Sequence, residues 1–404
     1  MRAKYVAALT IPTADRATAA TPAPAAVTRL FRATRCIDGT NASSQVQNAS
    51  VDLPITLPVS PMLAKAVTWE FVEDLMTKNL VQLEPKWDGF RCIVLRDGNQ
   101  VELASRGSKP LTRYFPEVVR AVLEHLPPRC AIDAEIVVRK GPPGAQRLDW
   151  DSLSQRIHPA DSRVQRLAAE TPAELICFDI LALDDDDLTR LPFGERRERL
   201  ESALSSLPVE APIHLTRTTT DAATAREWFE RFEGAGLDGV VAKALAAPYQ
   251  QGKRVMFKIK HSRTAEAVVI GYRIHKSGTG VGSLLLGLYD EHGTLYPVGG
   301  VSAFTNTRRV ELIDELAPLV LTDDQGDPVK GATERSRFSA NKDTSFVRLR
   351  PERVVEVKFD QMEGPRFRHT VTLLRWRPDR DPESCAAAQV DRPIAYDLDA
   401  VLQR

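Results

Sequence analysis

The chain has 404 residues, with 54 basic and 54 acidic residues and therefore no formal net charge. This length accommodates two domains, and a hydrophobic content of 43% supports substantial cores. The balanced charge excludes a global positive field as the means of binding nucleic acid, so such binding depends on local clusters. Nothing in the sequence approaches the roughly 18 consecutive apolar residues of a membrane span. We therefore expect a cytoplasmic protein without a membrane partner.

The cysteines predict packing thiols. They are odd in number, show no Cys-x-x-Cys spacing, and mostly lie beside apolar or small residues: Cys36, Cys92, Cys130, Cys177 and Cys385. This pattern argues against both a disulfide framework and a zinc site. The seven histidines include no pair at metal-binding helical spacing.

Residues 1–50 are rich in Ala, Thr, Pro and Arg without periodicity, which predicts a disordered tail. The apolar stretch after Lys4 is too short for a signal peptide, and no clean cleavage site follows it. A further hypothesis is that this tail is not translated natively, because Val51 opens the first globular segment and valine codons can serve as bacterial starts. A peptide from residues 1–50 in mass spectra of the native protein would refute it.

From Leu53 onward, the patterns predict helices over 69–78, 114–126, 150–156, 160–169, 193–207 and 222–233. Strands are predicted over 80–83, 90–95, 101–105, 130–138, 175–181, 236–243 and 254–260. The four aspartates of 184–187 predict a solvated turn, for which a metal site is the alternative.

Beyond residue 263 the pattern changes to short strands over 266–272, 283–289, 295–301, 353–359 and 371–376, interrupted by one helix over 308–319. This arrangement suits a small β-barrel such as the OB-fold. The predicted domains are thus 51–263 and 264–382, followed by a weakly structured tail over 383–404.

Lys86 lies where a strand meets a turn, within Glu84-Pro85-Lys86-Trp87-Asp88-Gly89-Phe90-Arg91. We expect a hairpin around it, and Asp97-Gly98 predicts a second tight turn between β-prone runs. A lysine that loses its proton can attack phosphorus or carbonyl carbon. A surface lysine beside a turn aspartate is the alternative for this motif alone.

Charged residues on other strands offer possible partners for Lys86. Lys258 and Lys260 share one face of their strand, opposite Phe257 and Ile259, and an anion between the two ammonium groups would relieve their repulsion. A solvated strand face is the alternative.

Carboxylates and an aromatic ring complete the set. Asp133 and Glu135 share a face, and Asp238 begins a strand, so acids from separate strands could gather Mg²⁺. Each acid alone is an ordinary surface group. Phe178 is by default a core residue, with stacking on a purine as its alternative role.

The region from residue 330 to 380 has 13 basic and seven acidic residues, a local excess of six positive charges. The sequence from Phe367 to Arg380 is particularly rich in arginine. A polyanion-binding face is one interpretation, and a solvated barrel rim is the other.

The order of the motifs resembles the covalent nucleotidyltransferase superfamily and, within it, the ATP-dependent DNA ligases, above all the small bacterial C-type repair ligases. The resemblance covers about Leu53 to Pro382. It rests on Lys86-Trp87-Asp88-Gly89-Phe90-Arg91, Ser105-Arg106-Gly107, Asp133-Ala134-Glu135, Phe178-Asp179-Ile180-Leu181, Leu237-Asp238-Gly239-Val240-Val241-Ala242-Lys243, Phe257-Lys258-Ile259-Lys260 and Arg375-Trp376-Arg377-Pro378-Asp379-Arg380.

The resemblance implies an α+β nucleotidyltransferase domain followed by an OB-fold domain. It also implies that Lys86 attacks ATP to form lysyl-AMP, with Lys258 and Lys260 neutralising the α-phosphate. Implied nucleotide contacts are Glu84 beside adenine, Phe178 stacked on it, and Arg91 and Arg106 at ribose and phosphate. Glu135 would bind ribose or metal, and Arg375, Arg377, Asp379 and Arg380 would swing onto the pyrophosphate. Glu135 and Asp238 would hold Mg²⁺ or Mn²⁺.

Three positions depart from the family pattern. Gly107 stands where Asn is usual, Ala134 where Gly is usual, and Asp238 where many relatives have Glu. None removes a reacting group, although the shorter side chain of Asp238 alters the expected metal geometry.

The expected activity is sealing of nicks in duplex DNA, in DNA repair, by a monomer. The alternatives are an RNA ligase, a capping-type nucleotidyltransferase or a non-catalytic nucleic-acid-binding protein. The polar segment 323–346 is a further hypothetical DNA contact.

Overall fold

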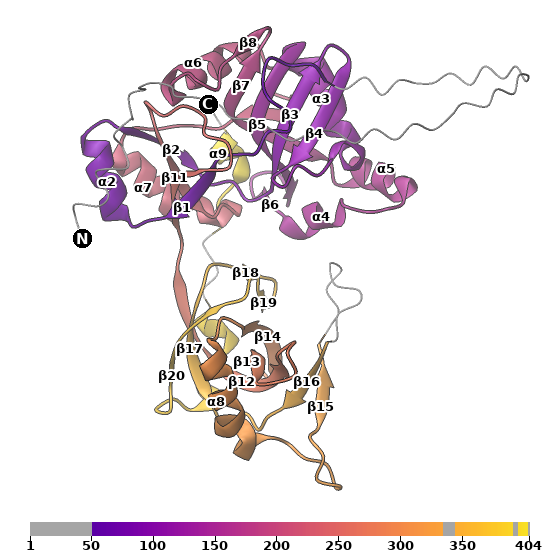
Figure 1. Cartoon of the computed structure of the whole chain (residues 1–404), viewed down its shortest axis with the longest axis vertical. Helices are drawn as coiled ribbons and strands as arrows, with labels where there is room; N and C mark the ends of the chain where they lie inside the picture. Colours follow the sequence, from indigo (N-terminus) through magenta and orange to yellow (C-terminus); the bar gives the residue numbers. More distant parts are fainter. Residues whose placement is uncertain (1–50, 334–343, 391–394, 403–404) are drawn as a thin grey trace, which may run out of the picture. The chain divides into compact units, whose positions relative to one another are not determined.

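The computed structural model describes residues 51–333, 344–390 and 395–402 (Figure 1). The predicted tail, residues 1–50, lies outside them, as does part of the hypothetical DNA-binding segment 323–346. None of the helices within these ranges has the length and apolar character needed to cross a membrane. Mixed helices and sheets confirm the predicted α+β class.

The elements up to residue 260 are, in order, β1 (Leu63–Ala66), α2 (Trp69–Thr77), β2 (Val81–Pro85), β3 (Phe90–Asp97), β4 (Gln100–Ser105), η1 (Thr112–Tyr114), α3 (Pro116–His125), β5 (Arg129–Lys140), β6 (Arg147–Leu148), α4 (Trp150–Gln155), α5 (Asp161–Glu170), β7 (Ala173–Leu183), β8 (Asp186–Asp187), α6 (Phe193–Ala203), β9 (Ile213–Leu215), α7 (Ala222–Arg231), η2 (Phe232–Ala235), β10 (Gly239–Ala244) and β11 (Arg254–Lys260). The longer predicted elements are therefore confirmed, with ends shifted by a few residues. The four aspartates of 184–187 lie in the predicted exposed turn, although the last two form the short β8.

Two sheets organise this part of the chain. A seven-stranded sheet has the order β4-β3-β5-β7-β8, with β6 beside β5 and β9 beside β7. Apolar residues of α3 and α6, such as Val118, Val122 and Leu200, pack against it in one buried cluster. A four-stranded sheet has the order β1-β11-β10-β2, in which β1 runs parallel to β11.

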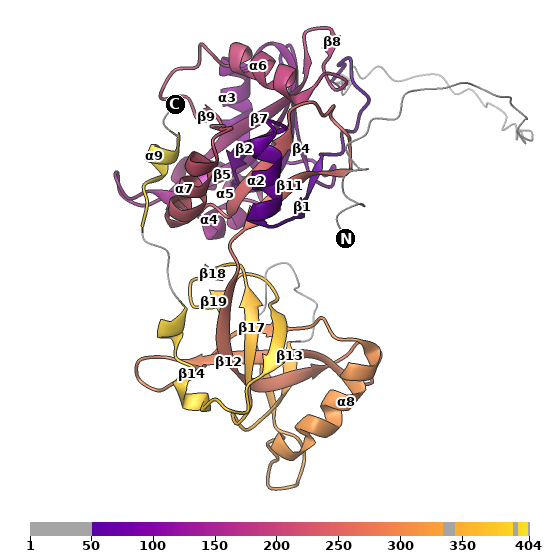
Figure 2. The same ribbon diagram turned by 90° about the vertical axis from the view of Figure 1, so that its left-hand side faces the viewer.

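The four-stranded sheet has an apolar face and a polar face. Phe257 and Ile259 of β11 and Val240 of β10 pack in one cluster with α2 and α7, which flank this sheet (Figure 2). Period-two alternation directs Lys258 and Lys260 to the other face, as the sequence predicted. Charged side chains of β11 therefore lie together on the polar face of this sheet.

The predicted hairpin around Lys86 is wrong. β2 pairs with β10, whereas β3 pairs with β4 and β5, so the segment after Pro85 crosses from one sheet to the other. Leu83 of β2 and Val94 of β3 belong to different apolar clusters, which explains why the two strands part. The second predicted hairpin is confirmed: Gly98 has a φ of 58° in the turn between β3 and β4.

The remaining elements are β12 (Arg263–Ile274), β13 (Val281–Tyr289), β14 (Leu295–Val301), α8 (Asn306–Leu316), η3 (Ala317–Leu319), β15 (Lys330–Ala332), β16 (Ser345–Arg348), β17 (Val354–Phe359), β18 (Met362–Glu363), β19 (Arg366–Phe367), β20 (Thr372–Trp376), η4 (Pro382–Ser384), η5 (Ala387–Gln389) and α9 (Leu398–Leu402). β12 pairs with β13, β16 and β17, and β17 pairs with β20. A bridge between Val301 and Val371 joins the two ends of this curled sheet. It encloses its own core between Ala265 and Val390, which is the small β-barrel that the strand pattern predicted.

The region after Asp381 is more ordered than the sequence suggested. Leu398 and Val401 of α9 are buried in the same cluster as α2 and α7, and Figure 2 shows α9 beside α7. Asp399 accepts a hydrogen bond from Arg139 at 2.6 Å. Spacing of apolar residues by three along one short helix is a weak sequence signal, which is why α9 was missed.

Candidate active site

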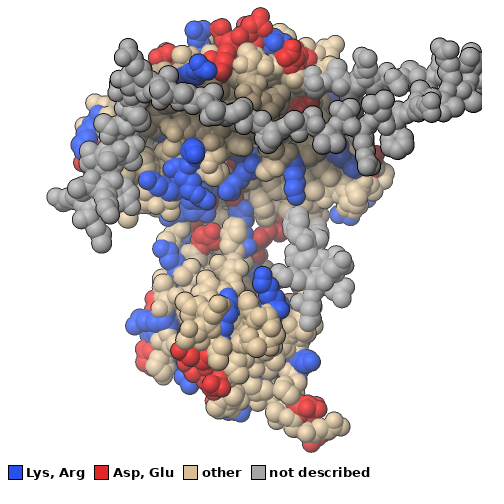
Figure 3. Space-filling model, in the orientation of Figure 1, with Lys and Arg blue, Asp and Glu red and all other residues tan. Residues whose placement is uncertain are grey.

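A cavity of about 820 Å³ is lined by residues of both sheets of the first domain. Lys and Arg side chains gather over β1 and β11 on the face shown in Figure 3. All the site residues predicted before residue 261 line this cavity: Glu84, Lys86, Arg91, Arg106, Glu135, Phe178, Asp238, Lys258 and Lys260. The fold therefore brings together charges that are up to 176 positions apart in the sequence.

Lys86 is held by its backbone and by its side chain. Its amide donates to the carbonyl of Gly239 at 2.8 Å, and the amide of Asp238 donates back to the Lys86 carbonyl at 3.0 Å. Its Nζ lies 2.6 Å from Asp238 Oδ2, and 19% of its side chain is exposed. An amine fixed in position yet open to the cavity suits a nucleophile.

Asp238 also holds a second lysine. Lys260 Nζ lies 2.7 Å from the same Oδ2. Burial acts to lower the pKa of Lys260, but the Asp238 and Asp360 carboxylates outweigh it and raise this pKa. By contrast, burial and the neighbouring charges of Lys260 and Lys86 lower the pKa of Lys258. The cavity thus has positive charge that is only partly neutralised, which is the condition for binding phosphate.

Two carboxylates are available to a metal ion. Glu135 Oε1 accepts from the amide of Gly89 at 3.2 Å, and burial raises the pKa of Glu135 to about 7. Asp238 Oδ1 is buried and accepts no hydrogen bond within the described chain. Among the residues that the structure describes, no group of three or more His, Cys, Asp or Glu side chains is arranged to hold a metal ion. Two carboxylates completed by substrate phosphates are nevertheless a set that Mg²⁺ accepts, so the residues fit this ion.

Gly89 permits the close approach that orients Glu135. A Cβ atom at this position would lie 2.1 Å from the carbonyl oxygen of Ile136 and 3.0 Å from Cγ of Glu135. The sequence motif Asp88-Gly89 therefore has a steric basis, because any larger residue would separate β3 from β5.

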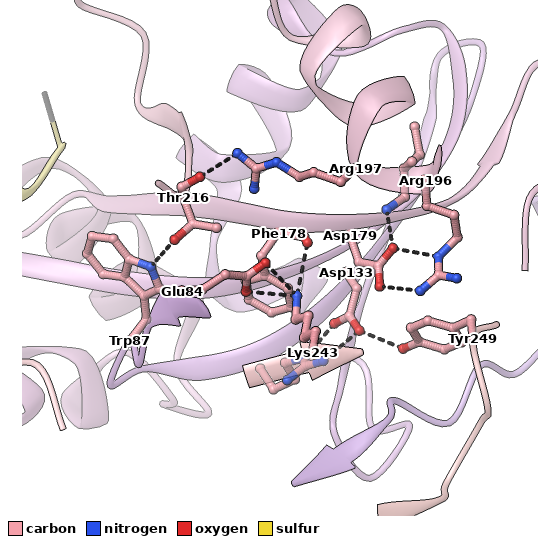
Figure 4. A network of polar contacts seen from close by, with 12 residues as sticks. Glu84, Trp87, Asp133, Phe178, Asp179, Arg196, Arg197, Thr216, Lys243 and Tyr249 are labelled. Carbon is pink, nitrogen blue, oxygen red and sulfur yellow. Dashed lines mark hydrogen bonds and ion pairs between the residues drawn. The ribbon is translucent and has the colours of Figure 1, made fainter. Parts of the chain in front are cut away.

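Glu84 and Phe178 lie together at another part of the cavity wall. Lys243 Nζ is 2.9 Å from Glu84 Oε1 and donates to the Phe178 carbonyl at 3.0 Å (Figure 4). The Arg91 guanidinium lies 4.4 Å from the centre of the Phe178 ring. Phe178 is thus a mostly buried residue that also borders the cavity, so both interpretations of it remain compatible with its position.

Asp133 and Arg106 have different surroundings. Asp133 forms a bidentate ion pair with Arg91, at 2.5 and 2.6 Å, and accepts from the Tyr249 hydroxyl at 2.6 Å. These contacts make it an internal support for Arg91. Although burial opposes this effect, Asp133 raises the pKa of Arg91. Arg106 is exposed at the cavity and contributes to lowering the pKa of Lys258.

The C-terminal end of the arginine-rich segment, from Arg375 to Arg380, does not line the cavity. Arg375 pairs with Glu356 at 2.6 Å, and Arg380 pairs with Glu266 at 2.5 Å. Arg377 pairs with Glu266 and, at 2.7 Å, with Asp379. The structure therefore does not bring Arg375, Arg377, Asp379 and Arg380 to the other predicted site residues, and their roles stay predictions.

Sequence reasoning missed several residues of the cavity. Lys243 was quoted within a family motif but given no role, although its spacing by two from Val241 along β10 indicates a shared face. Arg368 and His369 also line the cavity, and Arg368 forms an ion pair with Asp88. No pattern in the sequence distinguishes these two from the neighbouring arginines.

Comparisons with known proteins agree with this architecture. A family model described as ATP dependent DNA ligase domain matches residues 61–260, and one described as ATP dependent DNA ligase C terminal region matches residues 277–380. The chain is 53% identical to DNA ligase C of Mycobacterium tuberculosis over 365 residues, covering 87% of this chain and 99% of the relative.

DNA ligase C2 of Mycolicibacterium smegmatis is also 53% identical, covering 85% of this chain and 97% of the relative. A solved structure named Pmar-Lig_PreS3 superimposes with a TM-score of 0.55 at 15% identity, covering 79% of this chain and 68% of the other. The last likeness concerns the fold alone.

Proposed function

The chain belongs to the ATP-dependent DNA ligase family, and from this premise we propose that Lys86 is the residue that becomes adenylated. The observation that carries the proposal is the position of its amine, 2.6 Å from Asp238 in a cavity that also contains Lys258 and Lys260. The alternatives of an RNA ligase, a capping enzyme or a non-catalytic binding protein are not favoured, because matching models cover most of the chain and describe DNA ligases.

In the first step Lys86 Nζ attacks the α-phosphorus of ATP. A P–N bond forms, the bond between this phosphorus and the bridging oxygen breaks, and pyrophosphate leaves. Asp238 Oδ2 lies within hydrogen-bonding distance of the amine and is placed to hold its proton. Lys258 and Lys260 stabilise the charge that develops on the phosphate oxygens.

Glu135 and Asp238 would hold Mg²⁺ or Mn²⁺. When bound, the ion supplies further stabilisation of charge on the phosphate oxygens. Glu84 and Phe178 would contact the adenine base, while Arg91 and Arg106 would contact the ribose and phosphate.

Two transfers complete the reaction on DNA. The 5′-phosphate of a nick attacks the lysyl-AMP phosphorus, so that a phosphoanhydride forms and the P–N bond breaks. The 3′-hydroxyl then attacks the 5′-phosphorus, which forms the phosphodiester and releases AMP. We propose nicked duplex DNA as the substrate and repair as the setting, and the cytoplasmic monomer expected from the sequence stays a prediction.

The test is transfer of radiolabel from α-labelled ATP to the protein, followed by sealing of nicks with deoxyribose or ribose at the 3′ side. Wild type should become labelled and seal DNA, whereas Lys86→Ala should show neither activity. Lys78→Ala is a matched control, because Lys78 forms an exposed pair with Asp74 away from the cavity. Labelling of Lys86→Ala at the wild-type rate would refute the assignment.

A further inference from the structure

A buried ion pair joins Glu84 to Lys243 at the edge of the cavity. Lys243 Nζ lies 2.9 Å from Glu84 Oε1 and 2.8 Å from Oε2, so both carboxylate oxygens contact one ammonium group. Only 3% of Glu84 and 4% of Lys243 is exposed. Since each carboxylate oxygen has two acceptor positions, Glu84 keeps further acceptor capacity for a ligand in the cavity that it lines.

Lys243 also contacts Phe178. Its ammonium donates to the Phe178 carbonyl at 3.0 Å and lies 4.7 Å from the centre of the ring. Figure 4 shows the lysine pointing toward Glu84 and Phe178 together. One side chain thus connects a hydrogen-bonding group and an aromatic ring of the same cavity.

Strand register explains this position. In the antiparallel pair of β10 and β2, Val241 is opposite Glu84 and Lys243 is opposite Gln82. Lys243 and Glu84 are therefore diagonal neighbours on one face, within reach of a long side chain. The lysine is fixed by the same pairing that places the backbone of Lys86.

Burial and three charged side chains of the protein influence the pKa of Glu84. Burial raises the pKa of Glu84, Lys243 and Arg197 lower it, and Asp179 raises it. Arg197 donates to the carbonyl of Thr216 at 2.7 Å, and Asp179 is paired with Arg196 at 2.8 Å. Lys243 is the group that contacts Glu84 directly, so its removal leaves burial opposed mainly by Arg197.

The protonation state of Glu84 decides which purine it can accept. An ionised carboxylate only accepts hydrogen bonds, whereas the protonated acid both donates and accepts. Adenine carries an amine at position 6, which donates, and hypoxanthine carries a carbonyl there, which accepts. An ionised Glu84 facing position 6 therefore favours adenine, while a protonated Glu84 pairs with either base.

We propose that Lys243 is a positioning residue for nucleotide specificity, which keeps Glu84 ionised and oriented toward position 6 of the base and places Phe178 beside it. This inference rests on the proposed function, in which ATP binds this cavity. It assigns the choice of adenine to a buried pair of residues on β2 and β10. Neither residue takes part in bond making or breaking.

The test compares labelling of the protein by α-labelled ATP and by α-labelled inosine triphosphate, in wild type and in Lys243→Met, from pH 6.5 to pH 9. Wild type should prefer ATP at every pH in this range. At pH 6.5 the ratio should fall about tenfold in Lys243→Met, the effect of losing one charge-assisted hydrogen bond. Any dependence of this ratio on pH in Lys243→Met should be a rise with rising pH, because ionisation of Glu84 removes its ability to donate to hypoxanthine.

Lys243→Arg should restore the wild-type ratio, and Lys78→Met controls for the same chemical change on an exposed helix surface. If Lys243→Met does not fold, as judged by circular dichroism, Glu84→Gln combined with Lys243→Met replaces a charged pair by a neutral one of similar shape. Its amide can pair with either base, so the ratio should be small at every pH.

Each outcome decides the inference. A wild-type ratio in Lys243→Met or in the double variant overturns it. A ratio in Lys243→Met that falls as pH rises also overturns it, since ionisation of Glu84 should favour adenine. Labelled wild type without preference for ATP refutes this inference alone, whereas wild type that no nucleotide labels refutes the proposed function.

Discussion

The charges of the cavity wall and those of Arg375 to Arg380, at the end of the arginine-rich segment, lie in opposite environments. In the cavity, burial raises the pKa of Glu135 to about 7, and Asp238 Oδ2 is shared between two lysines. In the segment, the hydrogen bond from Arg377 lowers the pKa of Asp379 to about 2. Glu135 is thus kept in an environment that disfavours its charge, whereas the arginine partner of Asp379 favours the charged form of that carboxylate.

This difference distinguishes charged groups of the cavity that can bind a ligand directly from arginines that are already paired with carboxylates. Groups whose charges are incompletely compensated in the protein gain most when a ligand of the right charge arrives. Arg375, Arg377 and Arg380 already have carboxylate partners in Glu266, Glu356 and Asp379. They must exchange these partners before they can bind pyrophosphate, and such an exchange requires a conformational step of the kind that gates many enzymes.

After the complete loss expected for Lys86→Ala, the next largest effect should come from Asp238→Asn. The change removes the negative charge between Lys86 and Lys260 while preserving the shape of the side chain. We expect single-turnover labelling by ATP to slow about 10²- to 10³-fold, the usual effect of deleting one preorganised electrostatic group. Asp74→Asn, in an exposed pair, is the control. An unchanged labelling rate for Asp238→Asn would remove Asp238 from the mechanism.

Arg377→Ala should affect only one step. If the segment serves the pyrophosphate, labelling by ATP should fall about tenfold or more, while sealing of a nick that already carries AMP should be unchanged. Gel assays of the two steps with the same preparation measure this split. Equal loss in both steps would instead indicate damage to the fold or to DNA binding.

The raised pKa of Glu135 should make the free energy of unfolding depend on pH in an unusual direction for a carboxylate. Its folded pKa, about 7, lies above that of an unfolded glutamate, so the folded protein retains a proton that the unfolded chain has released. Stability from this group is therefore present at low pH and lost as pH rises from about 4.5 to 7. Because the side chain is partly exposed, we expect about 1–3 kcal/mol.

Urea unfolding of wild type and Glu135→Gln without metal, at pH 5.5 and pH 8.0, measures this contribution. The other carboxylates are common to both proteins, so the difference between their pH dependences reports Glu135. Identical pH dependences would show that Glu135 ionises normally.

The smallest effect should come from Arg308→Ala on α8. Arg308 pairs with Glu311 and Glu315 on an exposed surface, so it matches Arg377 in the number of its partners but not in its proposed role. Exposed pairs of this kind contribute about 0–1 kcal/mol. Labelling and sealing should both remain at wild-type rates, and a loss of either would mean that α8 belongs to the DNA-binding surface.

Local patterns predicted most of the elements because they depend on neighbouring residues. Alternation placed Lys258 and Lys260 on one face, and Asp97-Gly98 defined a turn. The predicted hairpin at Lys86 failed because strand partners depend on which core each strand enters, and Leu83 and Val94 enter different ones. That choice is made by residues distant in the sequence, which no local pattern contains.

The site shows the same division. The order of motifs predicted nine of the residues that line the cavity, including Asp238 and Glu135. Lys243 was missed because its function as a partner of Glu84 arises from the register between β10 and β2. The ion pairs of Arg377 and Arg380 with Glu266 were likewise inaccessible, since Glu266 is more than 100 positions away.

The return of α9 to the first domain has a practical consequence for dissecting the molecule. The barrel lies between two segments that both belong to the first domain's buried core, so in topological terms it is an insertion. A protein ended after Lys260 would lose Leu398 and Val401 from the buried apolar cluster to which α2 and α7 also contribute. An internal deletion that joins residue 262 to residue 395 through a short linker would instead keep that core closed, and is the better route to a first domain that folds alone.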